Sequence, residues 1–214
     1  AQFPFHTWLP DTMGAPTPVS ALMHAGIING GGYLVVRLSP VLVHTLSALH
    51  MLAIVGALTA VYASMVMLSQ TSVKRALAYS TIAQMGFMLL QCGLGAFHLA
   101  VLHLVAHSLY KGHAFLSCGS AVETAKKLNA KPHYAQLKPS RIWLAISISF
   151  AIVFGLSIPF NVSPSDKPGM LVLSMVLVMA LTQLLWTAMR RGQSGIAFAG
   201  TTGVASSIAA LYYS

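Results

Sequence analysis

Apolar runs bounded by charged residues or by proline divide the chain into segments that are each about as long as a membrane-spanning helix, which needs about twenty residues. These segments lie near 16–38, 48–69, 73–93, 95–121, 141–160, 170–190 and 194–213. Hydrophobic residues make up 56% of the chain and charged residues only 7%, whereas soluble domains are about one-quarter charged. The pattern therefore predicts an all-α integral membrane protein with about seven transmembrane helices.

The basic residues predict how these helices are oriented. If the segments cross the membrane alternately, Arg37 and Lys167 fall on one side. The other side receives Lys74, Arg75, Lys126, Lys127, Lys131, Lys138, Arg141, Arg190 and Arg191. Because basic residues accumulate in cytoplasmic loops, we expect this second side, with the polar loop 124–140, to be cytoplasmic. The net charge of +9 then reflects topology rather than nucleic-acid binding.

The segment 95–121 carries ionisable residues where a spanning helix normally has none. His103, His107 and Lys111 follow one another at four-residue steps, so on a helix they form one stripe of about two turns. The apolar run continues past Lys111 for about 15 Å at 1.5 Å per residue, which places the lysine near the middle of the bilayer. The alternative is that Lys111 lies near a helix end and reaches the lipid headgroups.

The chemistry of this stripe suits proton transfer. An unperturbed histidine titrates near pH 6.5, and burial in an apolar medium disfavours the charged form of an amine. Two histidines one turn apart also fit a metal ion, and haem ligation with His24 is a further alternative. However, a nearby lysine repels a divalent cation, and the carboxylates Asp11, Glu123 and Asp166 fall at helix ends or in loops. We therefore expect no metal and no cofactor.

Two neighbouring helices offer further polar groups. The first contains His24, Asn29 and three consecutive glycines, a run that permits local unwinding or close helix packing. The third begins at Lys74 and continues with Tyr79, Ser80 and Gln84, which line a water path or hydrogen-bond between helices.

Enzymatic and redox motifs are missing from the sequence. There is no Gly-rich phosphate loop, nucleophile elbow or HExxH motif, so we expect no catalytic centre in this chain. Cys92 and Cys118 lie in apolar segments without metal-ligand spacing and are expected to be small packing residues.

Three stretches resemble the antiporter-like proton-translocating membrane subunits of complex I and of Mrp cation/proton antiporters. They are PFHTWLPDTMGAPTPVSALMHAGII, QTSVKRALAYSTIAQMGFMLL and LHLVAHSLYKGHAFLSCGS. The resemblance implies that Lys111 is the central proton carrier and that His107 and His103 relay protons to it. It also implies that His24 connects two half-channels, and it matches Lys74 to a basic residue of the pathway.

The family members are longer, so we expect this chain to be a C-terminal fragment of a larger protein. Residues 1–123 resemble the translocation core, 124–140 form the basic loop, and 141–214 form the C-terminal helices. The sequence departs from the family at Gly14, where an acidic residue is usual, and in 141–160, which lacks the lysine of complex I subunits. A third hypothesis gives the chain only a structural role: it would be an inactive remnant if the native protein begins at Ala1.

Within this group, the residues of the core and the short C-terminal part resemble the DabB family. These are membrane subunits of bacterial inorganic-carbon transporters, found in the inner membrane with a zinc-binding, carbonic-anhydrase-like DabA subunit. The resemblance implies a proton- or sodium-conducting subunit that energises uptake of CO2 or bicarbonate. The alternative is a proton-pumping subunit of complex I, assembled with other complex I membrane subunits, or a Mrp-type antiporter.

Overall fold

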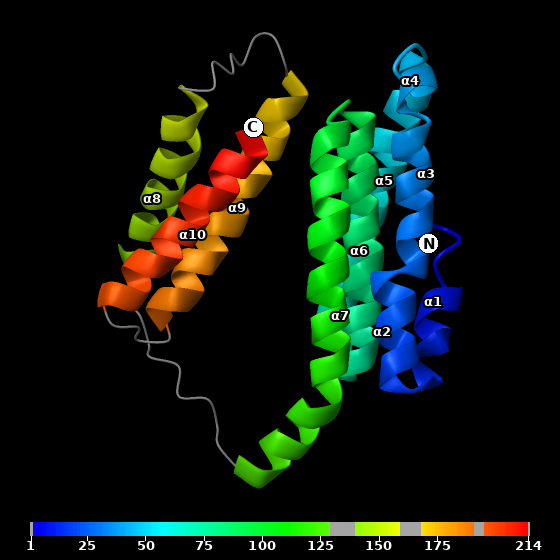
Figure 1. Ribbon diagram of the computed structural model, residues 1–214, viewed down its shortest axis with the longest axis vertical. Helices are drawn as coiled ribbons and strands as arrows, with labels where there is room; N and C mark the ends of the chain where they lie inside the picture. Colours follow the sequence, from blue (N-terminus) through cyan, green and yellow to red (C-terminus); the bar gives the residue numbers. More distant parts are fainter. Residues whose placement is uncertain (1, 129–139, 159–167, 191–194, 214) are drawn as a thin grey trace. The chain divides into compact units, whose positions relative to one another are not determined.

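The computed structural model describes residues 2–128, 140–158, 168–190 and 195–213, and every regular element in these ranges is a helix (Figure 1). This confirms the predicted all-α fold. The chain divides into two compact units, residues 1–130 and 131–214, which are described separately.

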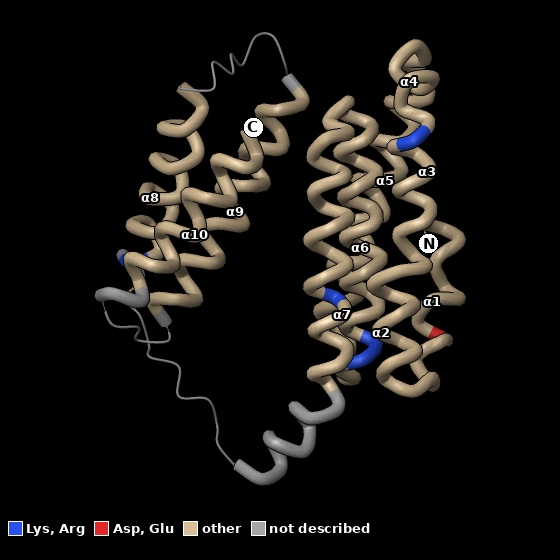
Figure 2. Tube along the Cα trace, viewed as in Figure 1, with Lys and Arg blue, Asp and Glu red and all other residues tan. Residues whose placement is uncertain are grey.

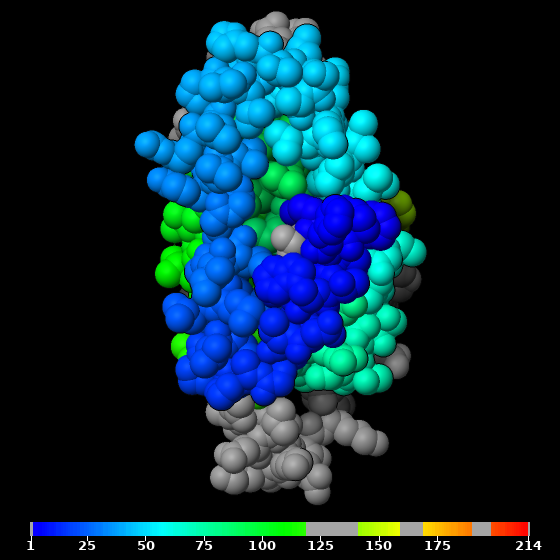
Figure 3. Space-filling model, turned by 90° about the vertical axis from the view of Figure 1, so that its right-hand side faces the viewer, coloured from blue at the N-terminus to red at the C-terminus, as the bar shows by residue number. Residues whose placement is uncertain are grey.

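The first unit contains three long helices and a chain of shorter ones. The long helices are α5 (Leu46–Leu68), α6 (Val73–Gly93) and α7 (Phe97–Leu128). The shorter elements are α1 (Trp8–Asp11), η1 (Thr12–Gly14), α2 (Thr17–Ala25), η2 (Ile27–Asn29), α3 (Gly30–Arg37) and α4 (Ser39–Leu42). Figure 3 shows the N-terminal segment and the α2–α3 segment side by side on one face, with the green α6 and α7 visible between them.

The first predicted spanning helix, 16–38, is interrupted. Helix α2 ends at Ala25, one turn of 3-10 helix follows, and α3 begins at Gly30. The break leaves carbonyl groups without their helical partners, and the Asn29 side chain satisfies one of them, since its Nδ2 donates to the carbonyl of Ala25 at 2.6 Å. Local unwinding is therefore present, but it lies at residues 26–29, whereas the three consecutive glycines expected to cause it form the first turn of α3.

Helices α5 and α6 approach each other closely because glycine lies at their contact. A Cβ atom on Gly56 would lie 2.5 Å from the backbone nitrogen of Leu90 and 2.6 Å from the carbonyl oxygen of Gly86. The turn into α7 needs glycine for another reason: Gly95 has a φ of 78°, which side-chain-bearing residues rarely adopt. Together these contacts fix α6 between α5 and α7.

The described residues of the second unit form three packed helices: α8 (Ser140–Ser157), α9 (Pro168–Arg190) and α10 (Gly195–Tyr213). Its buried residues are mostly apolar, among them Val153, Leu181 and Leu185. Tyrosines at the end of α10 tie it to the beginning of α9, because Tyr213 shares a hydrogen bond with Ser174 at 3.1 Å.

Helices of the described chain lie at the positions of the seven predicted segments, but the number of membrane spans stays a prediction. By length and apolar composition, three segments of the described chain qualify as membrane spans: Thr17–Arg37, Leu46–Leu68 and Gly169–Met189; Arg141–Ser157 is a shorter apolar helix. The helix predicted to end near 121 continues to Leu128, so the predicted loop 124–140 is helical at its beginning. Its residues 129–139 lie outside the described part of the chain.

We predict that Gly56→Ala destabilises the first unit, because the added methyl group meets backbone atoms that cannot move independently. Overpacking of this kind costs about 1–3 kcal/mol, and thermal unfolding of the detergent-solubilised full-length protein measures it. The control is Gly31→Ala in α3, where a Cβ meets nothing within 4 Å. Equal unfolding temperatures for the two variants would contradict the proposed contact.

Candidate ion-translocation site

Lys111 lies inside the first unit, at the centre of the candidate site. Its exposed fraction is 0%, and it is the largest of the fully buried side chains described. The amine Nζ donates a hydrogen bond to the carbonyl oxygen of Leu77 at 3.0 Å and another to the hydroxyl of Ser80. Both acceptors belong to α6. No carboxylate within the described residues forms a salt bridge with Lys111, so neutral acceptors alone hold the amine.

His24 reaches the same carbonyl group through a threonine. Its Nδ1 lies 3.1 Å from the Thr81 hydroxyl oxygen, and that hydroxyl donates to the carbonyl of Leu77 at 3.1 Å. Because a hydroxyl has one proton, this arrangement assigns the hydrogen to Nδ1 of His24 and makes Thr81 the acceptor. Leu77 is thus the shared acceptor that links His24 of α2 to Lys111 of α7.

The remaining nitrogen of His24 is available for a further contact. The ring is fully buried and stacks on Phe115 with centroids 4.4 Å apart. Its Nε2 has no hydrogen-bond partner among the described residues, and with the proton on Nδ1 it carries a lone pair. This atom can accept a hydrogen bond or a proton.

His107 precedes Lys111 by one helical turn and is almost completely buried, with 4% of its side chain exposed. Neither ring nitrogen has a partner within the described part of the chain. The half-buried ring of His103 lies 6.1 Å from that of His107 and 5.5 Å from Phe87. Since buried polar atoms are normally hydrogen-bonded to protein or to water, His107 is a natural site for bound water.

Asn29 connects the interrupted helix to this region. Besides capping α2, its Nδ2 donates to the hydroxyl of Ser108 at 2.8 Å, and Ser108 directly follows His107 on α7. The Oδ1 atom of Asn29 is buried and has no partner among the described residues. The break between α2 and α3 is therefore fixed against the helix that carries Lys111.

The other predicted pathway residues are placed differently. Lys74 is half-buried, and its Nζ donates to the carbonyl of Ala15 at 3.0 Å. The half-buried Tyr79 has its ring 6.4 Å from that of His6, whereas Gln84 is exposed. Of the polar residues predicted on α6, Ser80 is thus the one that contacts Lys111. Figure 2 shows how few charged positions lie among the coloured residues of the first unit.

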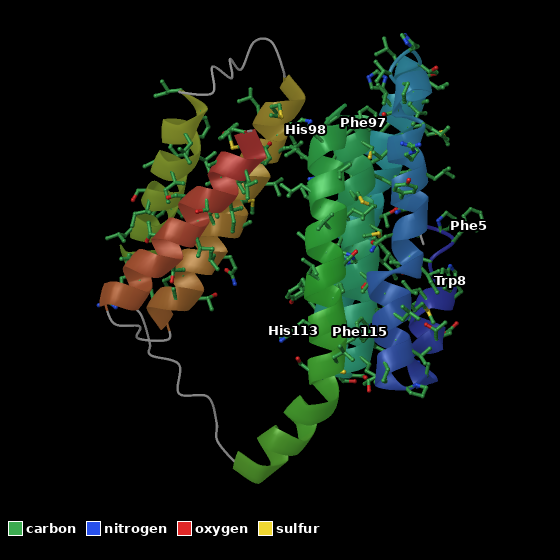
Figure 4. The ribbon with its side chains drawn as sticks, viewed as in Figure 1. Phe5, Trp8, Phe97, His98, His113 and Phe115 are labelled. Carbon is green, nitrogen blue, oxygen red and sulfur yellow. The ribbon has the colours of Figure 1, made fainter. Side chains whose placement is uncertain are left out.

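The two histidines off the stripe, His98 and His113, are both exposed. Figure 4 shows His113 and Phe115 on opposite sides of α7, with Phe115 directed toward α2. Cys92 and Cys118 are buried and not disulfide-bonded. Among the residues described, no group of three or more His, Cys, Asp or Glu side chains is arranged to hold a metal ion.

A family model described as "NADH:quinone oxidoreductase/Mrp antiporter, TM" matches residues 1–198. The chain belongs to this family. The core of the family resemblance is therefore confirmed, and the match extends well beyond the stretches that suggested it.

Several relatives carry more specific names. The chain is 58% identical over 133 residues, 62% of its length, to the "Probable inorganic carbon transporter subunit DabB1" of Halothiobacillus neapolitanus, covering 24% of that protein. It is 46% identical over 90% of its length to a DabB subunit of Hydrogenovibrio crunogenus, covering 36% of that protein. The chain is also 44% identical, over 57% of its length, to NADH-ubiquinone oxidoreductase chain 5 of Dictyostelium citrinum, and it covers 18% of that protein.

Among solved structures, the Mrp complex from Dietzia sp. DQ12-45-1b matches the whole chain with a TM-score of 0.57 and 26% identity. The chain covers 23% of the matched chain of that complex. It likewise spans about a quarter to a third of the length of the DabB relatives above. It therefore corresponds to one part of a longer family member.

Three components of the site were not among the predicted site residues: Ser108, the backbone carbonyl of Leu77, and Thr81, although Thr81 is one of the polar residues that the sequence shows in the third predicted helix. A threonine or serine inside an apolar helix most often bonds to its own helix, as Thr81 and Ser108 also do. Their second contacts depend on which helix lies opposite, and that information is in the tertiary packing.

We predict that Thr81→Val destabilises the protein, because it leaves the Nδ1–H group of His24 buried without an acceptor. An unpaired buried donor costs about 1–3 kcal/mol, which thermal unfolding of the full-length protein measures. Thr182→Val, which removes a hydroxyl bonded to Val178 of its own helix, is the control.

A double-mutant cycle isolates the His24–Thr81 contact. Phenylalanine at position 24 keeps a ring to stack on Phe115 but has no N–H group, so Thr81→Val should cost less in the His24→Phe background. An identical cost in both backgrounds would show that the two side chains do not interact.

Proposed function

We propose that this chain forms the central proton-conducting part of a membrane subunit that energises inorganic-carbon uptake. The observation that carries the proposal is the burial of Lys111, held by neutral acceptors, beside histidine nitrogens that have no partner among the described residues. Ionisable residues inside a membrane are costly and usually functional. The named DabB relatives point to inorganic carbon as the transported species.

Lys111 is the proposed proton carrier because its surroundings accommodate both forms of the amine. The ammonium donates to Leu77 and Ser80, and the neutral amine can keep both hydrogen bonds as a donor while its lone pair accepts a proton. A carboxylate at this distance would instead hold the ammonium as a fixed ion pair. Proton gain and loss therefore require no rearrangement of the helices.

The histidines are the proposed relay. His107 and Lys111 are neighbours on one helix face, where Cβ atoms lie about 5–6 Å apart, a gap that one water molecule bridges. His103 continues the route along α7. The hydrogen bonds through Thr81 and Leu77 hold His24 beside the Lys111 site, and its Nε2, which has no partner among the described residues, is the atom that can take a proton from water. The proposed route includes three further polar residues that do not contact Lys111. These are Lys74, which lies at the beginning of α6, Tyr79 and Gln84.

Protons suit this site better than sodium ions. Sodium binding requires several oxygen ligands without a competing cation, whereas the groups at this site are an amine, imidazoles, two hydroxyls and one carbonyl. A proton can instead be passed between the amine, the imidazoles and the hydroxyls with water between them, while the carbonyl only accepts a hydrogen bond. We therefore assign protons as the conducted ion.

The full-length subunit is proposed to lie in the bacterial inner membrane, with the α5–α6 connection and the segment after α7 on the cytoplasmic side, as the basic residues suggest. Its proposed partner is a zinc-binding, carbonic-anhydrase-like subunit of the DabA type. In this arrangement proton flow past Lys111 drives hydration of CO2 to bicarbonate in the partner.

A second candidate is a proton-pumping subunit of complex I or of a Mrp-type antiporter. It is supported by the similarity to NADH-ubiquinone oxidoreductase chain 5 and to the Mrp complex. The site would work in the same way, but proton movement would be coupled to quinone reduction in complex I or to cation exchange in an antiporter.

We predict that Lys111→Met abolishes inorganic-carbon uptake in cells that depend on the full-length protein, while the protein still assembles. Methionine approximates the volume and the flexible, unbranched shape of lysine, so the packing around position 111 is retained. Labelled-bicarbonate uptake and thermal unfolding are measured together. His113→Ala, an exposed change on the same helix, is the control, and normal uptake by Lys111→Met would refute the role of Lys111.

The partner distinguishes the two candidate functions. We expect the full-length protein, purified in mild detergent, to bring down a second subunit that contains zinc, measured by metal analysis of the complex. Co-purification with NADH-oxidising or quinone-reducing subunits would instead favour the complex I function.

A further inference from the structure

A cavity in the first unit opens beside the groups that hold Lys111. Its volume is about 340 Å³, and its lining runs from the end of α5 through the α5–α6 connection into the first two turns of α6. Leu77, Ser80 and Tyr110 form one part of this lining. Leu77 and Ser80 are also the two residues whose oxygens accept the hydrogen bonds of Lys111.

The composition of the cavity changes from its outer to its inner end. Gln70, Thr71 and Ser72 of the connecting segment give it a polar rim. The apolar side chains of Val73 and Ala76 follow, and Ser80 lies one turn deeper along α6. A cavity needs only about 10–15 Å³ for one water molecule together with polar partners, so this one has room and hydrogen-bonding groups for several.

The two sides of Lys111 are chemically different. An ammonium carries three N–H donors, of which Leu77 and Ser80 occupy two. The cavity lies on the side of these acceptors, whereas His107 and His103 precede Lys111 on α7. Helix α7 returns antiparallel to α6 after the turn at Gly95, so His103 lies near Phe87, far along α6 from the cavity rim.

We propose that this cavity is a water-filled entrance through which protons reach Lys111 from the membrane side that carries Lys74 and Arg75. Water in the cavity exchanges protons with Lys111 across the Ser80 hydroxyl, and the histidines conduct on the opposite side. The entrance rests on the proposed function and adds the direction of access to it. Protons reach Lys111 past the N-terminal turn of α6, which contains Ala76.

Cysteine accessibility tests the entrance. Ala76→Cys is introduced into the full-length protein, with its other cysteines replaced, in membrane vesicles of both orientations. A membrane-impermeant sulfonated thiosulfonate reagent should label it from the side of Lys74 and Arg75, and the added group should lower proton flux about tenfold or more, equivalent to about 1.4 kcal/mol in the barrier.

The matched control is Leu109→Cys, next to Tyr110 on α7 but 73% exposed on the apolar outer surface. Lipid covers this position in the membrane, so the charged reagent should react with it slowly and leave flux unchanged. Labelling of Ala76→Cys from the opposite side, its absence, or labelling without loss of flux would each overturn the entrance.

The same vesicles separate this proposal from the function on which it rests. If Lys111→Met abolishes flux while the cysteine at position 76 fails the test, the entrance is wrong and Lys111 remains the carrier. If Lys111→Met conducts normally, the proposed function fails, whatever the labelling shows.

Discussion

The structure of the first unit depends on one constraint: the fully buried amine of Lys111 must have hydrogen-bond acceptors. Among its described residues, the unit offers no carboxylate to Lys111. The acceptors come from α6, as one backbone carbonyl and one hydroxyl. A carbonyl inside a helix already accepts from the helix's own N–H group, so the Leu77 oxygen shares its remaining capacity between Lys111 and the Thr81 hydroxyl. The position and orientation of α6 relative to α7 therefore determine whether the amine of Lys111 has hydrogen-bond acceptors.

Several packing features maintain that geometry. The glycine contact between Gly56 and Gly86 lets α5 hold α6 closely, and the sharp turn at Gly95 returns the chain to begin α7 beside it. On the other side, Asn29 fixes the interrupted helix against Ser108. This brings His24 against Phe115 and Thr81. The helix break, which lowers the stability of α2 and α3 as an isolated span, thus positions a histidine next to the lysine network.

Much of this arrangement follows from the sequence. The four-residue spacing of His103, His107 and Lys111 predicts a common face, and the structure buries that face at His107 and Lys111. The same reasoning groups Ser80 with Gln84, yet only Ser80 meets Lys111, while Gln84 is exposed. Periodicity identifies a face of a helix but not which turns of that face a neighbouring helix covers.

For the same reason the pairs His24–Thr81 and Asn29–Ser108, which join residues 57 and 79 positions apart, cannot be predicted from spacing. The sequence also does not predict that α7 extends to Leu128, because the polar residues after 121 are as compatible with a helix as with a loop.

The central claim is that protons cross the membrane through Lys111. Its most direct test is proton flux into liposomes that contain the full-length protein and its partner subunit, followed with an internal pH-sensitive dye under an imposed pH gradient and a clamped membrane potential. The account predicts flux that is independent of sodium in the wild-type protein and falls to the level of empty liposomes in Lys111→Met. Undiminished flux in that variant, or flux that requires sodium, would contradict it.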